Sequence, residues 1–319
     1  MPETPASELS ALLEAELATP VPDAVAAMAA VIRARHRAAA AAVLFYGSCL
    51  RKGVVDGVLD YYLIVDAYRD AYAGRFLALL NRLLPPNVFY VECDHSGTRL
   101  RAKYAVFSQR DFDARAAGGP DARVWSRFCQ PARIVWSRDE AARERVVASV
   151  LRATCTAVTQ MLAWLPGDTT VQRFAPAELW QRGFRETYGS ELRGEGGATI
   201  DSLYTAAPER FDRVATLALA ADPRSKVKAM QDVIEVESDP RERAQARRRW
   251  ALARRRAKAL TVLGLFKTTL TFDDWVSYAL WKVERHSGKK VELTERQRRR
   301  PLVYAWPVII RLLRENVLR

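Results

Sequence analysis

Residues 43–66 read VLFYGSCLRKGVVDGVLDYYLIVD, which is two apolar runs separated by a short polar segment. The first run, residues 43–46, is short enough to be one buried strand, and Gly47 and Ser48 interrupt it. The second run, residues 58–65, carries Asp60 near its start, and Asp66 follows its end. This order predicts a strand, a glycine turn, a short helix and a second strand that bears a carboxylate.

The same order resembles the nucleotidyltransferases of the polymerase-β type. There the Gly-Ser main chain approaches a nucleoside triphosphate, since only glycine lets N–H groups come close to phosphate oxygens. In those enzymes acidic side chains hold Mg²⁺, which takes oxygen ligands and keeps phosphates and waters in its shell, and the resemblance implies this role for Asp60. We therefore expect an α/β fold, with a polymerase-β-type nucleotidyltransferase domain followed by a mostly helical domain. The alternative is an ordinary strand–turn–strand unit in which Asp60 is solvated.

The positive charge of the chain is concentrated in its last third. The 319 residues include 50 Lys and Arg against 37 Asp and Glu, a formal charge of +13. Residues 224–319 hold 24 basic and 11 acidic residues, whereas residues 1–223 hold 26 of each. The first two thirds therefore resemble an enzyme body in composition, and the last third predicts contact with an anionic surface.

The four cysteines, Cys49, Cys93, Cys129 and Cys155, lie far apart and form no C-x-x-C pair. This spacing predicts neither a zinc site nor a disulfide framework, so a reducing, cytoplasmic compartment is expected. The N-terminal segment is acidic and lacks the pattern of a secretory signal, and no apolar window of 18 residues predicts a membrane-spanning helix.

Outside the central stretch, most of the chain shows helical periodicity. We expect His36 to be solvated, because it stands between Arg35 and Arg37 near the end of an alanine-rich helix. Strands are predicted at residues 88–92, 103–107 and 134–136, the first two as a hairpin that continues the sheet. Helices are predicted at residues 6–17, 22–42, 72–84, 139–164, 177–188, 208–221 and 241–258, and residues 222–240 are unassigned. The predicted units are a nucleotidyltransferase domain over residues 1–138, a helical domain over 139–238, and a basic helical C-terminal region over 239–319.

Five segments together resemble the mitochondrial-type CDP-diacylglycerol synthases, the translocator-maintenance family of phosphatidate cytidylyltransferases. The segments are FYGS at 45–48, LDYYLIVD at 59–66, NVFY at 87–90, KYAVFS at 103–108 and RFCQPARIV at 127–135. Two residues depart from the family pattern, since Ala105 replaces a glycine and Gln130 replaces a lysine. The resemblance implies transfer of a cytidylyl group from CTP to phosphatidate, with Mg²⁺ as cofactor and pyrophosphate as the second product.

Candidate metal ligands are Asp60, Asp66 and Glu92. Asp60 is the first choice, because Asp66 is six residues away, about 20 Å along an extended strand. The second carboxylate that usually follows two residues after the first is here Tyr62. Asp66 matches the family motif but could equally terminate the strand, and Glu92 is placed in a strand expected to be adjacent, where it could instead face solvent. Asp56 is the weakest candidate.

Candidate phosphate-binding groups are the main-chain N–H groups of Gly47 and Ser48 at the start of the next helix. Arg51 and Lys52 lie in the first turns of that helix and are nucleotide-binding candidates, with solvated surface residues as the alternative. Lys103 matches the lysine of the family and could offset charge on the α-phosphate or on the leaving pyrophosphate. A histidine base is not required, because a phosphate monoester is already an anionic nucleophile near neutral pH.

The C-terminal region suggests contact with a membrane surface. Arg298, Arg299 and Arg300 precede the apolar residues 302–313, which include Trp306. Basic residues beside aromatic and apolar ones suit the headgroup level of an anionic bilayer, which predicts a peripheral protein on the inner face of a membrane. The alternative is that residues 302–313 pack into the helical domain. Nucleic acid is a disfavoured partner, though a nucleotidyltransferase acting on nucleic acid or on a small molecule, or a non-catalytic relative, remains the competing interpretation.

Overall fold

A five-stranded mixed sheet forms the centre of the computed structural model, which describes residues 4–119, 121–167, 169–189, 197–230, 233–271 and Thr294. The strand order is β3-β4-β2-β1-β5, in which β2 and β4 are parallel and all other neighbours are antiparallel. Residues 43–46 and 58–65 are strands, as predicted, and they pair with each other in this sheet. The strands are β1 (Ala40–Tyr46), β2 (Val58–Val65), β3 (Asn87–His95), β4 (Thr98–Ser108) and β5 (Ala132–Ser137).

Strands β3 and β4 form the predicted hairpin, and it is joined by a two-residue turn. Ser96 and Gly97 both have positive φ angles, 50° and 77°, as the tight turns that match strand twist require. Strand β4, not β3, pairs with β2. The hairpin therefore continues the sheet with its second strand on the inside.

The two faces of the sheet are both covered, because alternate side chains of each strand belong to different apolar clusters. Along β2, Tyr61 and Leu63 lie in one cluster, while Tyr62 and Ile64 lie in the other. Helix α2 (Asp23–His36) covers the first face and contacts all five strands. Buried strands on both faces explain why the runs at residues 43–46 and 58–65 are continuously apolar rather than alternating.

The predicted helix over residues 22–42 is wrong at its C-terminal end. Helix α2 stops at His36, residues 37–39 form a single 3₁₀ turn (η1, Arg37–Ala39), and Ala40 already belongs to β1. Ala40, Ala41 and Ala42 are buried in the sheet, so tertiary packing overrides the helix preference of alanine.

The expectation that His36 is solvated is also wrong. His36 is buried at the point where α2 turns into the sheet, with Nδ1 2.8 Å from the carbonyl oxygen of Ala71 and Nε2 3.2 Å from the hydroxyl of Tyr104. Burial lowers the pKa of His36, the hydrogen bond to Ala71 opposes this, and the charge of Arg35 adds to the lowering.

The second face of the sheet shares one apolar cluster with most of the helices. This cluster contains Leu9 from α1, Phe112 from α6, Val150 from α8 and Phe211 from α11, and it therefore crosses the predicted boundary at residue 138. That boundary and the one at residue 238 stay predictions. The helices concerned are α1 (Pro5–Leu17), α6 (Gln109–Ala116), α7 (Trp125–Phe128), α8 (Glu140–Trp164), α9 (Pro176–Tyr188), α10 (Gly197–Thr205) and α11 (Pro208–Ala221).

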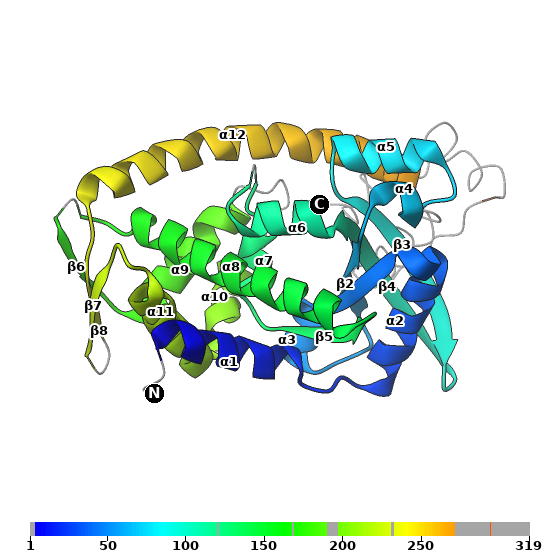
Figure 1. Cartoon of the computed structure of the whole chain (residues 1–319), viewed down its shortest axis with the longest axis horizontal. Helices are drawn as coiled ribbons and strands as arrows, with labels where there is room; N and C mark the ends of the chain where they lie inside the picture. Colours follow the sequence, from blue (N-terminus) through cyan, green and yellow to red (C-terminus); the bar gives the residue numbers. More distant parts are fainter. Residues whose placement is uncertain are drawn as a thin grey trace.

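Helix α8 runs through the middle of the helical layer (Figure 1). Among the described residues it is the one helix long and apolar enough to cross a membrane by length and composition alone. More than half of its side chains are buried against α6, α7, α9, α11 and the sheet. Its apolar character is therefore explained by its place in the protein core.

The unassigned residues 222–240 contain two strands of a second, three-stranded antiparallel sheet. Its order is β6-β8-β7, and it lies at the end of the molecule away from β3 and β4 (Figure 1). Its strands are β6 (Val171–Phe174), β7 (Lys226–Met230) and β8 (Val233–Glu237).

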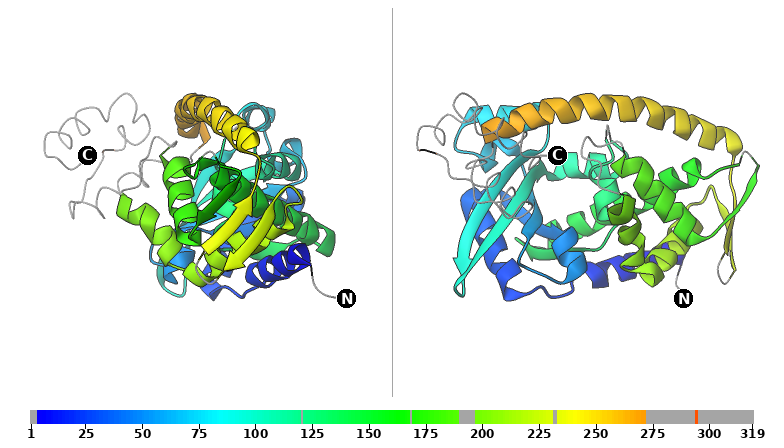
Figure 2. Two further views of the ribbon diagram at one scale, coloured as in Figure 1. Left: turned by 90° about the vertical axis from the view of Figure 1, so that its left-hand side faces the viewer. Right: turned by 180° about the vertical axis from the view of Figure 1, so that it is seen from behind.

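The basic helix predicted at residues 241–258 is longer than expected. Helix α12 (Pro240–Thr271) begins beside the second sheet and follows one side of the molecule to the region of α5 (Figures 1 and 2). The helix predicted at residues 72–84 is α5 (Arg75–Leu83), and a short helix that the sequence did not predict, α4 (Tyr68–Ala71), precedes it; both lie between β2 and β3.

Candidate functional site

Gly47, at the end of β1, brings the main chain into contact with the carboxylate of Asp60. Its φ is +92°, a conformation that side-chain-bearing residues rarely adopt, and a Cβ built there would lie 2.8 Å from Oδ2 of Asp60. Both features require glycine at this position. Gly47 and Asp60, which the sequence places at the end of one strand and near the start of the next, thus lie close together. Helix α3 (Ser48–Lys52) follows directly, and its five residues return the chain toward β2.

Asp60 and Lys103 lie side by side because of the strand register. Asp60 on β2 faces Tyr46 on β1 and Lys103 on β4. The Nζ of Lys103 is 3.1 Å from Oδ1 of Asp60, and the two side chains are 38% and 15% exposed. Apart from this ion pair, Oδ1 of Asp60 is buried and has no hydrogen-bond partner. A buried carboxylate oxygen with unused acceptor capacity is what a site for a metal or a donor ligand provides.

Aromatic side chains form the floor beside this carboxylate. Tyr62, two residues after Asp60, is buried, and its ring lies 5.1 Å from that of Tyr46 and 4.9 Å from that of Phe128. Burial raises the pKa of Tyr46 well above its usual value, and the neighbouring Tyr62 and Asp60 raise it further. Tyr46 is therefore a neutral phenol at physiological pH, and the position of a second carboxylate is occupied by an apolar ring.

A hydrogen-bonded chain from the helical layer reaches the same end of β1. Nη1 of Arg51 donates to Oε1 of Gln130 at 3.3 Å, and Nε2 of Gln130 lies 3.0 Å from the hydroxyl of Tyr188. Gln130 is buried and also donates to the carbonyl of Ser126 at 2.7 Å. These contacts fix the guanidinium of Arg51, a residue that the sequence analysis named as a nucleotide-binding candidate. Gln130 and Tyr188, which hold it in place, were not candidates.

Tyr188 comes from the end of α9, far from Arg51 in sequence. No local pattern joins residues 51, 130 and 188, so spacing alone could not find this chain of contacts. The one available signal was the departure of Gln130 from the lysine of the resembling family.

Glu92 lies farther from Asp60 than the sequence suggested. Strand β4 separates β3 from β2, so Glu92 is two strands from Asp60 and two residues out of register with it. That separation is about 12 Å between Cα atoms. Instead of approaching Asp60, Glu92 pairs with Arg99 at 3.0 Å and with Arg101 at 3.3 Å, and it accepts a hydrogen bond from Tyr90 at 2.6 Å.

Asp66 is placed at the other end of β2, directly after its last residue. Its carboxylate is half exposed and pairs with Arg138. Asp66 and Asp60 are thus separated by the length of the strand, as the spacing implied, and β2 does not bring them to one point. Metal binding by Asp66 and Glu92 stays a prediction that these positions do not support.

Three further candidates have weaker placements. Ser48 and Lys52 are exposed on α3, next to Gly47 and Arg51. Asp56 lies close enough to Cys49 to add, after burial and Asp60, to the raised pKa of that thiol. The predicted membrane residues Arg298, Arg299, Arg300 and Trp306 lie outside the described residues.

A resident Mg²⁺ site made wholly of protein ligands does not fit the described residues. They contain no cluster of three or more Asp, Glu, His or Cys side chains that could hold a metal ion. Mg²⁺ is, however, often held by one or two carboxylates together with the phosphates of a substrate. The Oδ1 of Asp60, which accepts no hydrogen bond and lies close to the Gly47 turn, fits that second mode, in which the metal would arrive with a nucleotide.

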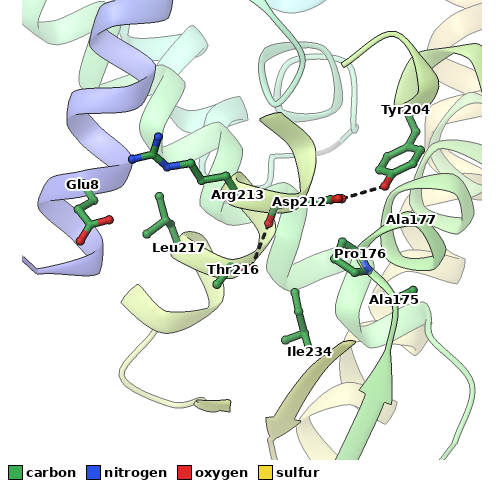
Figure 3. Close-up of a pocket in the computed structure, with 10 residues that line it drawn as sticks. All are labelled: Glu8, Ala175, Pro176, Ala177, Tyr204, Asp212, Arg213, Thr216, Leu217 and Ile234. Carbon is green, nitrogen blue, oxygen red and sulfur yellow. Dashed lines mark hydrogen bonds between the residues drawn. The ribbon is translucent and has the colours of Figure 1, made fainter. Parts of the chain in front are cut away.

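A pocket of about 460 Å³ lies elsewhere, between α1, α11 and the start of α9 (Figure 3). Its wall includes Glu8, Arg213 and Asp212, and the hydroxyl of Tyr204 donates to Oδ1 of Asp212 at 2.9 Å. Neither Asp60 nor Gly47 lines this pocket, so it is separate from the candidate site.

Comparison with known proteins gives little beyond this geometry. No family model matches the chain, and no curated protein matches it either. Among solved structures, a nucleotidyltransferase-like protein from Exiguobacterium sibiricum 255-15 aligns over 93% of this chain and 93% of its own, with 12% identity and a TM-score of 0.28. A likeness this weak supports no inference about function. What the structure establishes is a mixed α/β architecture with a charged pair, Asp60 and Lys103, against a glycine turn.

Proposed function

We propose that this chain is a nucleotidyltransferase that transfers a cytidylyl group from CTP to phosphatidate at the cytoplasmic face of a membrane. The observation that carries the proposal is the contact of the Gly47 main chain with the Asp60 carboxylate, beside Lys103. Three neighbouring strands thus supply a glycine turn that can approach phosphate, a carboxylate that can hold a metal ion, and a lysine that can offset negative charge. The choice of CTP and phosphatidate rests on the five sequence segments that resemble the cytidylyltransferase family.

In the proposed reaction, a phosphate oxygen of phosphatidate attacks the α-phosphorus of CTP. The new bond is the phosphorus–oxygen bond of CDP-diacylglycerol, and the bond from the α-phosphorus to the bridging oxygen of the β-phosphate breaks. Pyrophosphate leaves with that electron pair, so no proton has to be removed from the attacking oxygen.

The protein's part in this reaction is to position the triphosphate and offset its charge. The N–H groups of Gly47 and Ser48 would bind phosphate oxygens, and Arg51, fixed by Gln130, would meet the same phosphates. Asp60 would hold the Mg²⁺ that arrives with CTP, which supplies charge neutralisation at the phosphates. Lys103 would turn from Asp60 toward the leaving pyrophosphate, where charge develops.

A second function is favoured by the aromatic floor of the site. Tyr62 stands where a second carboxylate would complete a metal site, and Lys103 already balances the charge of Asp60. A chain with these features could bind a nucleotide without transferring it. This non-catalytic alternative predicts nucleotide binding that does not depend on Mg²⁺ and releases no pyrophosphate.

Pyrophosphate release separates the two functions. The purified chain is incubated with each of the four ribonucleoside triphosphates and Mg²⁺, with and without phosphatidate vesicles, and Asp60→Asn is the matched control. Release that needs CTP, phosphatidate and Asp60 together supports the proposal. Pyrophosphate release with RNA in place of phosphatidate would identify RNA, not phosphatidate, as the acceptor. Nucleotide binding without any pyrophosphate release would establish the non-catalytic alternative.

A further inference from the structure

The one fully buried side chain of helix α5 is polar, and it holds the helix against the sheet. Asn81 is fully buried, and its side-chain amide donates to the carbonyl of Val106 at 3.0 Å and to the hydroxyl of Tyr72 at 2.9 Å. Its Oδ1 accepts the main-chain N–H of Asn87 at 2.6 Å. These three hydrogen bonds fix the rotation of α5 about its axis, because a buried amide is costly to leave unpaired.

The apolar side of α5 consequently points away from the protein. Phe76, Leu79 and Leu83 follow one another at helical spacing, and they are 61%, 53% and 71% exposed. These are among the most exposed large apolar side chains in the described part of the chain. A surface helix normally turns such a stripe toward the core, so the inverted orientation of α5 requires an apolar partner.

The surroundings of this stripe are positively charged. Arg75 and Arg82 are exposed on α5, and the nine residues of this helix include no acidic residue. The Nζ of Lys267 on α12 contacts the carbonyl oxygens of Leu84 and Pro86, which attaches α12 to the segment that follows α5. Helices α5 and α12 lie along the same side of the molecule in each view (Figures 1 and 2), and α12 carries exposed Arg248 and Arg249.

We propose that the outward face of α5, formed by Phe76, Leu79 and Leu83 with Arg75 and Arg82, docks on the surface of an anionic lipid bilayer. An apolar stripe flanked by arginines on a short helix suits the interface between acyl chains and anionic headgroups. A second copy of the chain fits this face poorly, because symmetric pairing would bring Arg75 and Arg82 of one copy against the same arginines of the other. This inference deepens the proposed membrane location and rests on it, but it needs neither CTP nor turnover.

The docking face and the candidate site can be tested separately, because they lie at opposite ends of β2. Asp60 is near the beginning of this strand, whereas α4 and α5 follow its end. Substitutions on the outer face of α5 should therefore leave the Asp60–Lys103 pair intact.

Flotation of the full chain with vesicles tests the docking face. The vesicles are phosphatidylcholine with or without phosphatidylglycerol, an anionic lipid that is not the proposed substrate. The intact chain should float with the anionic vesicles, and Phe76→Gln/Leu79→Gln/Leu83→Gln should weaken this binding on the order of a hundredfold. Val171→Thr/Val233→Thr, which removes exposed apolar groups at the other end of the molecule, should bind as the intact chain does. The variant Arg75→Gln/Arg82→Gln should bind anionic vesicles on the order of tenfold more weakly than the intact chain at low salt, and nearly as well as the intact chain at high salt.

The possible outcomes separate this inference from the proposed function. Equal flotation of the intact chain and the triple variant, or no flotation of either, overturns the docking face. A dimer in size-exclusion chromatography that the triple variant converts to a monomer also overturns it in favour of a second copy. Pyrophosphate release on soluble short-chain phosphatidate is measured in parallel. If the intact chain floats with anionic vesicles but releases no pyrophosphate on soluble phosphatidate, the proposed reaction is overturned and the docking face is retained.

Discussion

Two aspartates of this protein each pair with basic side chains, yet their surroundings differ in one decisive respect. Asp121, in the segment between α6 and α7, is buried and contacts the guanidinium groups of Arg115 and Arg123, and it accepts the main-chain N–H of Arg123 at 3.0 Å. Asp60 pairs with Lys103, and its Oδ1 accepts no hydrogen bond. Both oxygens of the first carboxylate are used by the protein, whereas one oxygen of the second keeps acceptor capacity close to the Gly47 turn.

Electrostatics agrees with this contrast. Burial alone would raise the pKa of Asp121, but the charges of Arg123 and Arg115 and the hydrogen bonds from both residues hold it below its usual value. Asp121 is therefore ionised at physiological pH and committed to the fold. The ion pairs of Asp121 are therefore part of the folded core, whereas the ion pair of Asp60 leaves one oxygen available to a ligand.

The largest expected effect is the loss of turnover in Asp60→Asn. The substitution keeps the shape of the side chain but removes the charge that would hold Mg²⁺ and balance Lys103. CTP-dependent pyrophosphate release should fall on the order of 10⁴, while the free energy of unfolding in urea should change by less than about 1 kcal/mol. Near-normal turnover in this variant would remove Asp60 from the chemistry.

Asp121→Asn should show the opposite pattern. Removing one partner of a buried ion pair leaves Arg115 buried without its charge partner, and this typically costs about 3–5 kcal/mol of stability. Urea unfolding monitored by tryptophan fluorescence measures the loss, with Asp60→Asn as the matched control. A loss as small as that of Asp60→Asn would abolish the distinction drawn between the two carboxylates.

The variant Lys103→Ala tests whether the partner of Asp60 takes part in turnover. If Lys103 offsets charge on the leaving pyrophosphate, its removal should lower kcat on the order of 10²–10³ and affect the KM for CTP less. Lys103→Arg retains the charge on a side chain of different shape and should recover part of the loss. A change confined to KM, or equal loss in both variants, would contradict this role.

The sequence indicated Gly47, Asp60 and Lys103 as candidates, but it did not indicate the residues that surround them. Gly47 follows the first apolar run, Asp60 lies in the second, and Lys103 lies in the hairpin, and each of these patterns is local in the sequence. The register of β2 and β4 then brings Asp60 and Lys103 together. The position of Glu92 was wrong because a hairpin pattern does not tell which of its two strands pairs with β2. The contacts of Arg51 with Gln130 and of Gln130 with Tyr188 depend on how the helical layer packs, and no local pattern encodes that packing.

The same reasoning explains the errors in the fold. Strand β6 has four residues, and its partner β8 lies about sixty residues later, so neither had a pattern long enough to predict the second sheet. His36 was misplaced because its neighbours Arg35 and Arg37 are polar, although the helix ends there and turns the imidazole inward. Helix periodicity predicted α8 and α11 well, because each has a continuous buried face.

The smallest expected effect concerns Lys267, a buried basic group whose charge interacts with Arg115 and Arg123, the two partners of Asp121. Burial lowers the pKa of Lys267 to about 7, and the charges of Arg123 and Arg115 contribute to the lowering. Between pH 7 and the usual lysine pKa near 10.5, the unfolded chain binds a proton that the folded chain does not. The contribution of this group to the free energy of unfolding therefore rises as the pH increases through that window, with a slope of up to about 1.4 kcal/mol per pH unit.

The variant Lys267→Met tests this. It removes the titrating group and fills a similar volume, so the free energy of unfolding between pH 7 and 9 should rise less steeply with pH than in the intact chain. Parallel slopes for the two proteins would show that Lys267 keeps its ordinary pKa in the folded chain.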